Sequence, residues 1–330
     1  MNFLRYLDYL PIFKHREIRY GSDCSGIEAP LQALTALGIK YNHVFSSEIN
    51  KTSRELSFLN YGKPKLFFDD ITKRDHSLLP KIDLYVAGFP CQPFSQMGKR
   101  GGFDDYKGRG LIFFECYDTI IETDPDMFLL ENVKGLLTHD KGKTIDMIKM
   151  YLNKLDYDIY IDLLNTKHYG LPQNRERVFI VGLKKAKFNK FKFPDPIPLE
   201  YHIEDLTKES GRLPTTILTT HKKEILSDLK KYNKIDSFKK PWLVNLNSSS
   251  YKRSSPMLNI SPCLMASGAV YYITSEKRNL TPDEFLKLQG FIFFNKGKHQ
   301  SKIYNVAGNS MSVSVIAFLF AQMFSANRHL

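Results

Sequence analysis

The chain has 330 residues, of which 42% are hydrophobic, and it carries a formal net charge of +12 at pH 7. This length and apolar content allow one large domain, or a large and a small one, with a substantial core. No window of about 18 residues is apolar enough to span a membrane. Arg5, Asp8 and Lys14 interrupt the N-terminal stretch, which is therefore a poor signal peptide. We expect a cytoplasmic protein, or a nuclear one in a eukaryotic host.

Cysteine spacing and net charge indicate which metals, disulfides and binding partners are to be expected. The four cysteines are scattered and form no CxxC pair, so neither a metal site nor a disulfide framework is predicted. The segment 184–260 contains 16 Lys and Arg residues against 8 Asp and Glu residues. Such a basic surplus favours a polyanionic partner, although a biased composition alone would produce the same excess.

The first half of the chain alternates short apolar runs with helical patterns. Strands are predicted at 18–23, 43–48, 65–70, 82–88, 127–133, 157–165 and 177–183, and helices at 29–38, 111–121 and 144–155. This alternation predicts an α/β fold with a doubly wound, mostly parallel sheet that is covered on both faces.

The second half begins with a change of texture after Leu183. The run to about residue 270 has no regular periodicity, which predicts a small irregular module. Thr281, Pro282 and Glu284 then form a capping box that starts a helix. Residues 312–324 are predicted to be a buried helix or a strand–helix mixture. The predicted domains are 1–183, 184–270 and a C-terminal segment, 271–330, that partly returns to pack on the first.

Four features stand at the ends of predicted strands. They are the 23–30 turn with its glycine at Gly26, the carboxylates of Glu48 and Asp70, and Gly88. Ligands of doubly wound sheets bind at the carboxyl ends of the strands, so these features together predict an adenosine-bearing cofactor. The first turn lacks the GxGxxG phosphate cradle, which favours a nucleoside without phosphates over NAD.

Candidate catalytic residues lie in or next to three of the predicted strands. Cys91 comes directly after the fourth strand, where flanking prolines restrict the backbone of a candidate thiol nucleophile. Glu131 is a carboxylate in an otherwise apolar strand, which is costly unless it is partnered or protonated, and it is a candidate proton donor. Arg175 and Arg177 alternate, so they are expected to point to the same side of the last strand. Each of these features taken alone is also compatible with a structural or solvated residue.

Three motifs, in order and spacing, resemble the C5-cytosine DNA methyltransferases. They are GFPCQPFS at 88–95, ENV at 131–133 and QNRERVFIVG at 173–182, and the resemblance covers about 20–183 and 261–324. Two positions depart from the family pattern. Glu28 and Ala29 replace a glycine pair in the first turn, and Ile292 stands where the motif QGFP has its proline. Neither departure touches the expected reaction centre.

The resemblance implies a mechanism and a cofactor. Cys91 would attack C6 of a cytosine, Glu131 would bind or protonate N3, Arg177 would hold O2, and Arg175 would help to order this group. C5 would then take the methyl group of S-adenosylmethionine. The implied cofactor-binding residues are Cys24, Ser25, Gly26, Ile27, Glu48, Ile49, Asp70, Ile71, Gly88, Pro90, Asn309 and Ser310.

The implied substrate is double-stranded DNA with the target base flipped out of the helix. A loop from Gln92 to Gly108 would close on the DNA, and the basic segment would read the target site. The candidate DNA-binding residues are Gln92, Ser95, Lys99, Arg100, Lys252 and Arg253. The resemblance admits a cognate restriction endonuclease as a second partner, and no sequence feature indicates an oligomer, so a monomer is expected.

Three other readings remain. A tRNA cytosine-5 methyltransferase on the same scaffold would carry a Cys-Phe-Thr tripeptide, which this chain lacks. A catalytically silent relative would typically have lost the cysteine or the glutamate, and both are present. A Cys–His hydrolase would need a histidine base, and nothing around His168 favours that role.

Overall fold

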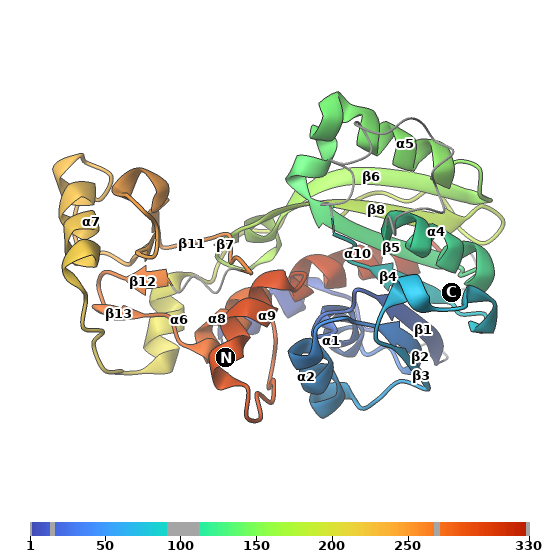
Figure 1. The fold of residues 1–330 in the computed structure, drawn as a ribbon, viewed down its shortest axis with the longest axis horizontal. Helices are drawn as coiled ribbons and strands as arrows, with labels where there is room; N and C mark the ends of the chain where they lie inside the picture. Colours follow the sequence, from blue (N-terminus) through green and yellow to red (C-terminus); the bar gives the residue numbers. More distant parts are fainter. Residues whose placement is uncertain (1, 14–16, 91–111, 267–270, 328–330) are drawn as a thin grey trace. The chain divides into compact units, whose positions relative to one another are not determined.

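The computed structural model describes residues 2–13, 17–90, 112–266 and 271–327 (Figure 1). The chain forms two compact units. The sheet unit consists of Leu10–Leu164, Glu176–Asp195 and Ile316–Leu330, and the mixed unit consists of Met1–Tyr9, Asn165–Arg175 and Pro196–Val315. The chain therefore passes between the units several times. The domain boundaries expected after residues 183 and 270 remain predictions.

The sheet unit is built on a seven-stranded sheet with the order β3-β2-β1-β4-β5-β8-β6. Its strands are β1 (Ile18–Asp23), β2 (Tyr41–Ser47), β3 (Leu66–Phe68), β4 (Leu84–Ala87), β5 (Met127–Val133), β6 (Tyr157–Asn165) and β8 (Glu176–Lys184). The five strands from β3 to β5 are parallel, and β8 is antiparallel to β5. The prediction of a doubly wound, mostly parallel α/β sheet is confirmed.

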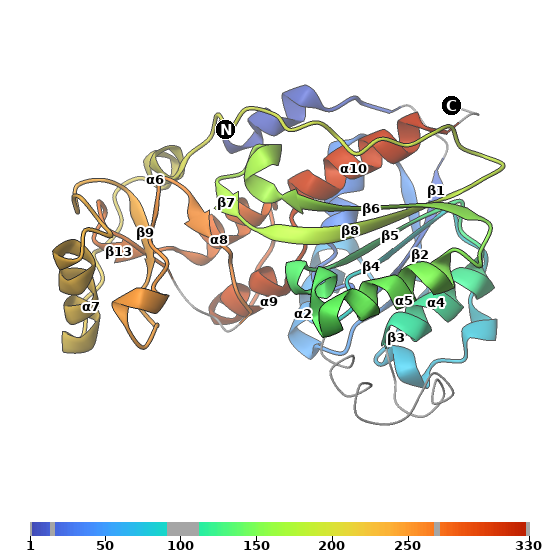
Figure 2. The same ribbon diagram turned by 90° about the horizontal axis from the view of Figure 1, so that it is seen from above.

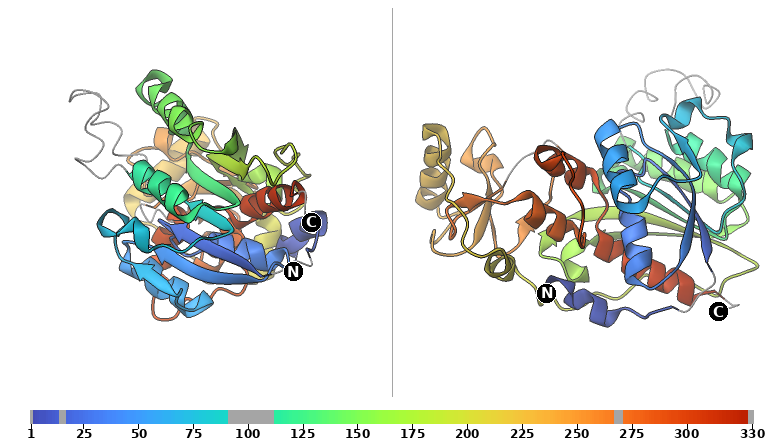
Figure 3. Two further views of the ribbon diagram at one scale, coloured as in Figure 1. Left: turned by 90° about the vertical axis from the view of Figure 1, so that its right-hand side faces the viewer. Right: turned by 90° about the horizontal axis from the view of Figure 1, so that it is seen from below.

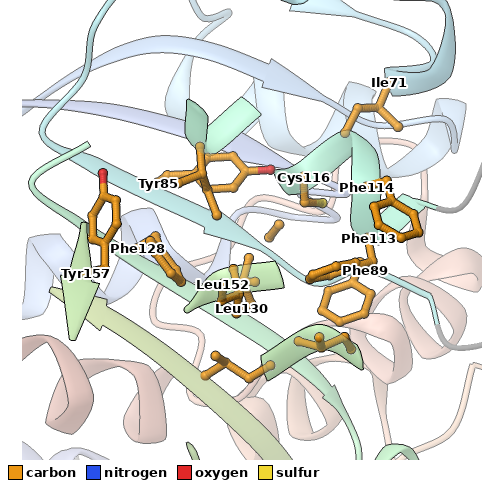
Figure 4. Packing of buried hydrophobic residues seen from close by; sticks show 14 of the residues in the cluster. Ile71, Tyr85, Phe89, Phe113, Phe114, Cys116, Phe128, Leu130, Leu152 and Tyr157 are labelled. Atoms are coloured by element: carbon orange, nitrogen blue, oxygen red, sulfur yellow. The ribbon is translucent and has the colours of Figure 1, made fainter. Parts of the chain in front are cut away.

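Helices cover both faces of this sheet. They are α1 (Ala29–Ala36), α2 (Lys51–Tyr61), α4 (Ile112–Thr123), α5 (Lys143–Leu152) and α10 (Val313–Ser325). Helices α4 and α5 lie on one side of the strands and α10 lies on the other (Figures 2 and 3). Phe113 of α4 and Leu152 of α5 pack with Tyr85, Phe128 and Leu130 of the strands in one buried cluster (Figure 4). The central strand β4 and most of β5 are buried, which explains why their sequences are almost continuously apolar.

Helix α10 comes late in the sequence but belongs, from Ile316 onward, to the sheet unit. The ring of Phe324 lies 5.9 Å from that of Phe13, and the backbone N–H of Asn189 donates to the Ala326 carbonyl at 2.7 Å. The stretch 312–324, expected to be a helix or a strand–helix mixture, is helical from Val313 onward and contains no strand. Among the described residues no single helix is long and apolar enough to span a membrane, and only the bent pair Gln300–Asn309 and Val313–Ser325 reaches that length jointly.

The mixed unit combines short strands with helices. Its strands are β7 (Gln173–Asn174), β9 (Trp242–Asn245), β10 (Met257–Leu258), β11 (Ser261–Pro262), β12 (Tyr271–Ile273) and β13 (Arg278–Asn279), and its helices are α6 (Ile203–Ser210), α7 (Thr220–Lys231), α8 (Pro282–Gln289) and α9 (Ile303–Asn309). Four strands pair in the order β10-β9-β12-β13, and β11 pairs with β7. Helix α8 has the expected capping box at Thr281 and Glu284. Helix α7 buries only Ile225 and Leu229, which explains why its periodicity is faint.

Candidate active site

Glu131 and Arg177 face each other across two strands of the sheet unit. In the antiparallel pair β5–β8, Val133 lies opposite Arg177 and Glu131 lies opposite Phe179. Alternate residues of a strand share a face, so Glu131 and Arg177 are diagonal neighbours. Their Oε1 and Nε atoms are 3.1 Å apart, and the two side chains are only 12% and 16% exposed. The arginine therefore offsets the cost of placing a carboxylate at this edge of the core.

Asn132, the next residue, points to the opposite face and fastens the end of β4. Its side chain is buried, and its Nδ2 donates to the Phe89 carbonyl at 2.7 Å. Its Oδ1 accepts from the backbone N–H of Val133 at 2.8 Å. The carbonyl that it holds is two residues before Cys91. In the dipeptide Glu131–Asn132, the glutamate thus presents its carboxylate on one face of the sheet, and the asparagine holds the end of the neighbouring strand β4 on the opposite face.

The chain beyond this anchor carries several of the expected site residues. Gly88 is half-buried and Pro90 is exposed at the end of β4. The proposed nucleophile Cys91 and the candidate DNA contacts Gln92, Ser95, Lys99 and Arg100 lie outside the described residues. Their assignments remain predictions.

The turn after β1 folds over the carboxylate of Glu48. The backbone N–H of Gly26 donates to Oε2 and that of Asn50 donates to Oε1, both at 2.7 Å. Burial raises the pKa of Glu48, and these two hydrogen bonds oppose the shift. Cys24 and Gly26 adopt positive φ angles of 50° and 57°, so the turn is sharp. Open space surrounds the position where Gly26 would carry a Cβ, which leaves its backbone accessible to a ligand.

The neighbouring strand end adds an apolar side chain and a second carboxylate. Ile49 is 75% exposed. The backbone N–H of Glu48 donates to the Phe68 carbonyl at 3.2 Å, so the ends of β2 and β3 are joined. Asp70 then accepts from the backbone N–H of Thr72 at 3.0 Å and starts a short 3-10 helix, Ile71–Lys73. An exposed apolar side chain beside two carboxylates and accessible backbone fits the base and ribose of a nucleoside.

Glu28 shows how the departure from the family pattern is accommodated. Its carboxylate is fully buried and accepts from Tyr20 Oη at 2.9 Å and Ser22 Oγ at 2.8 Å. Burial is the main cause that raises its pKa to about 7. His43 Nε2 lies 3.5 Å from Oε1, and burial lowers the pKa of that histidine to about 4. The carboxylate points into the β1–β2 packing, so it supports the turn from inside.

Arg175 has a different environment from the one that alternation suggested. It precedes β8 instead of lying in it, and it belongs to the mixed unit. Its buried guanidinium donates to the carbonyls of Leu264 at 2.8 Å, Gly308 at 3.2 Å and Ser310 at 2.7 Å. These bonds fix the backbone on either side of Asn309. Within that unit Arg175 therefore orders the segment that holds two of the expected cofactor-binding residues.

Lys252 and Arg253 lie in the loop between β9 and β10 of the mixed unit. Both side chains are exposed, in a short 3-10 helix, Tyr251–Arg253. The Tyr251 ring stacks on that of Tyr232 with centroids 4.6 Å apart and planes within 9°. Ser248 Oγ donates to the Asn245 carbonyl at 2.9 Å. The loop is thus held from within while its cations face outward.

Sequence reasoning assigned no role to three residues with central structural positions: Asp23 and Asn132, which lie in motifs that it singled out, and Arg74, which it did not. Asp23 and Arg74 form a fully buried ion pair with 2.8 Å between Oδ1 and Nη1. The available signal was an aspartate closing the first predicted strand, with an arginine soon after the third. In the parts of the chain that the structure describes, no group of three or more His, Cys, Asp or Glu side chains is arranged to hold a metal ion.

Known proteins share the sequence pattern and the fold. A family model described as C-5 cytosine-specific DNA methylase matches residues 21–325. The chain is 39% identical over 278 residues to the type II methyltransferase M.NgoBI of Neisseria gonorrhoeae, covering 83% of each chain. It is 37% identical over 308 residues to the type II methyltransferase M.HaeII of Haemophilus aegyptius, covering 92% of this chain and 91% of the relative.

Solved structures agree on the fold at lower sequence identity. One is a putative DNA modification methyltransferase encoded within an Escherichia coli prophage, with a TM-score of 0.66, 19% identity and coverage of 94% of this chain and 99% of that one. Another is a Spodoptera frugiperda DNMT2 variant, with a TM-score of 0.68, 17% identity and coverage of 93% and 99%. At these identities the likeness shows the architecture alone.

Proposed function

Because the chain belongs to the C-5 cytosine-specific DNA methylase family and is a DNA (cytosine-5) methyltransferase, we propose that Cys91, Glu131 and Arg177 carry its chemistry. The observation that carries this proposal is the Glu131–Arg177 pair at the strand edge where the chain leads into Cys91. The thiolate of Cys91 adds to C6 of the flipped cytosine, which makes C5 nucleophilic. After C5 is methylated, loss of its proton and expulsion of the thiolate release the product.

Glu131 and Arg177 bind the ring during this addition. The carboxyl group of Glu131 binds or protonates N3, which stabilises the charge that develops as the thiolate attacks. The guanidinium of Arg177 holds O2 and keeps Glu131 in place through the 3.1 Å contact. Arg175 acts through the backbone that it orders and makes no contact with the reacting atoms in this proposal.

We propose S-adenosylmethionine as the cofactor, which supplies an electrophilic methyl group when bound. The residues that would hold it are those of the 24–27 turn, Glu48 with Ile49, Asp70 with Ile71, Gly88 with Pro90, and Asn309 with Ser310. The exposed Ile49 and the accessible Gly26 backbone support a nucleoside at this edge of the sheet unit. Lone pairs of Glu48 that its two backbone bonds leave available are suited to ribose hydroxyls.

The direct test of the chemistry uses Cys91. Wild type and Cys91→Ser are expressed in cells, and the DNA is read by bisulfite sequencing. We expect 5-methylcytosine at one recurrent site with wild type and none with the variant, whose affinity for S-adenosylmethionine is retained. Duplex DNA with 5-fluorocytosine at that site, incubated together with S-adenosylmethionine, should become covalently joined to wild type alone, because fluorine on the methylated C5 cannot leave as a proton does. Undiminished methylation by the variant would falsify the proposed mechanism.

The loop between β9 and β10, residues 246–256, is proposed to contact DNA through Lys252 and Arg253. It has no acidic residue and its backbone is held by serine side chains and the tyrosine stack. A rigid basic loop loses little entropy on meeting a polyanion. If Arg253 reads a base, Arg253→Ala should spread methylation to sites with one altered base pair, whereas a phosphate contact would lower methylation evenly at all sites.

Cellular context follows from the relatives and remains part of the proposal. The type II methyltransferases among them support a role beside a cognate restriction endonuclease. We propose a monomeric enzyme in the cytoplasm, or in the nucleus of a eukaryotic host, where its DNA substrate lies. Light scattering of the purified protein with and without duplex DNA tests the monomer, and resistance of methylated plasmid to a matching nuclease tests the partnership.

A further inference from the structure

The last residue of β1 is the centre of a buried polar network in the sheet unit. The carboxylate of Asp23 is fully buried. It accepts two parallel bonds from Arg74, each 2.8 Å long. It also accepts from Tyr85 Oη at 2.8 Å and Ser47 Oγ at 2.6 Å. One carboxylate therefore joins β1, β2 and β4 to the segment that follows β3.

Arg74 is enclosed as completely as its partner. Its side chain is buried, with the guanidinium carbon 5.4 Å from the ring centre of Phe45 and 5.2 Å from that of Phe68. Its Nη2 also donates to Thr119 Oγ1 of α4 at 2.6 Å. Removing two charges from water is expensive, and well-packed apolar residues often stabilise a fold as much as a buried pair does. Stability alone therefore does not account for a charged pair at this position.

The position of the pair indicates that role. Asp23 directly precedes the 24–27 turn, and Arg74 directly follows the Ile71–Lys73 helix that Asp70 starts. These two segments come from different crossovers of the sheet, and the proposed function assigns cofactor contacts to both. We infer that Asp23 and Arg74 are positioning residues, which hold the two segments at the separation that S-adenosylmethionine requires. The inference rests on the proposed cofactor site.

This arrangement predicts a specific kinetic signature. Without the pair, the two segments would occupy the binding-competent arrangement for only part of the time. The apparent Kd rises in inverse proportion to that fraction. Saturating cofactor selects the competent arrangement again, so KM for the cofactor should rise while kcat changes little. A merely structural role would instead lower the fraction of folded enzyme and leave the Kd of the folded fraction unchanged.

The test uses the double variant Asp23→Asn/Arg74→Met, which removes both charges and fills the space between the two phenylalanine rings. Calorimetry with S-adenosylmethionine should give a Kd at least about tenfold above wild type, as expected if the competent fraction falls to about one tenth. Thermal unfolding should remain cooperative. Arg74→Lys, which keeps the charge but loses the paired bonds, supplies a second measurement if the double variant does not fold.

A second buried ion pair provides the matched control. Arg278 and Glu284 of the mixed unit are 2% and 1% exposed and lie 2.8 Å apart. Arg278→Met/Glu284→Gln removes one positive and one negative charge, as the first double variant does. The glutamine amide oxygen can replace the carboxylate in the capping box, and the Kd for S-adenosylmethionine should stay at the wild-type value. The inference is overturned if a folded Asp23 or Arg74 variant binds with wild-type Kd, or if the control weakens binding equally. Absence of binding by wild type would instead overturn the cofactor assignment itself.

Discussion

The parallel strand ends of the sheet unit and the β9–β10 loop of the mixed unit use polar residues in opposite ways. At the strand ends, Asp23, Glu48 and Asp70 all accept hydrogen bonds from the protein itself. In the loop, internal bonds come from serine and backbone groups, while Lys252 and Arg253 remain exposed. A small ligand with one fixed position requires polar groups that are already oriented. A charged polymer such as DNA binds instead to exposed cations, and the counterions of its phosphates are released.

The largest loss of activity is expected from a change at Glu131, the carboxylate that is proposed to bind the reacting base. Glu131→Gln should lower the single-turnover methylation rate by about 10²- to 10⁴-fold, because a positioned acid is lost. Affinity for S-adenosylmethionine should be retained. The matched control is Glu176→Gln, which alters a partly exposed carboxylate paired with Lys134. A rate within a few-fold of wild type for Glu131→Gln would remove this residue from the reaction.

A smaller loss of activity is expected from a change at Asn132, whose side chain holds the end of β4. Asn132→Ala leaves the Phe89 carbonyl without the Nδ2 donor that now reaches it at 2.7 Å. An unsatisfied buried acceptor costs about 1–3 kcal/mol, which corresponds to a rate loss of about 5- to 150-fold if it is expressed in the orientation of Cys91. The measurement is kcat with KM for DNA determined alongside. A fall in thermal stability with unchanged kcat in the folded enzyme would show that Asn132 only supports the fold.

The proposed DNA contacts of the exposed cations Lys252 and Arg253 can be tested by varying the salt concentration. Lys252→Ala and Arg253→Ala should each weaken DNA binding and reduce the slope of log K against log salt by about 1, as expected for one lost phosphate contact. Fluorescence anisotropy over a salt series measures it. Lys51→Ala, on α2, removes a lysine that is 80% exposed and serves as the control. Slopes equal to wild type for both loop variants would take this loop out of the phosphate contacts.

The smallest effect on activity is expected at Glu28, where the prediction concerns the pH dependence of stability. Burial raises its pKa to about 7, so its stabilising contribution is complete below the unfolded pKa of about 4.5 and is lost as pH rises through about 7. Tyr20, Ser22 and His43 face the carboxylate, and the histidine, with its pKa lowered to about 4, stays neutral over this window. Glu28→Gln imitates the protonated form.

Unfolding of wild type and Glu28→Gln is therefore compared between about pH 5 and pH 8. Wild type should lose about 1 kcal/mol per pH unit relative to the variant up to about pH 7. Glu122→Gln, at an exposed position at the end of α4, should show no such difference. A constant gap between wild type and Glu28→Gln over the whole range would mean that Glu28 is not buried in protonated form.

Sequence patterns located several strands accurately. The strands at 18–23, 127–133 and 157–165 match β1, β5 and β6 residue for residue. In β5 the signal is a nearly continuous buried apolar run, whereas in β6 the apolar residues are interrupted by the exposed Asp158 and Asp162. Helix α8 was found from its capping box alone. The strand ends also predicted where Glu48 and Asp70 would stand, because parallel strands all end at one edge.

Long-range pairing was beyond the reach of the sequence. Nothing local to Asp23 shows that its partner is Arg74, since the two are joined only when separate crossovers pack. Arg175 and Arg177 have the same spacing as alternating strand residues, yet the strand starts between them at Glu176. Helix α7 was missed because two buried residues leave too weak a period. In each case packing chosen by distant residues decided the outcome.

The late position of α10 has a consequence for biosynthesis. Residues from Ile316 onward complete a unit whose first strand is formed by Ile18–Asp23. A ribosome must therefore translate almost this entire sequence before that domain can close. Until about residue 325 has emerged, the nascent polypeptide carries an uncovered apolar sheet face, which makes it a natural client for chaperones during synthesis.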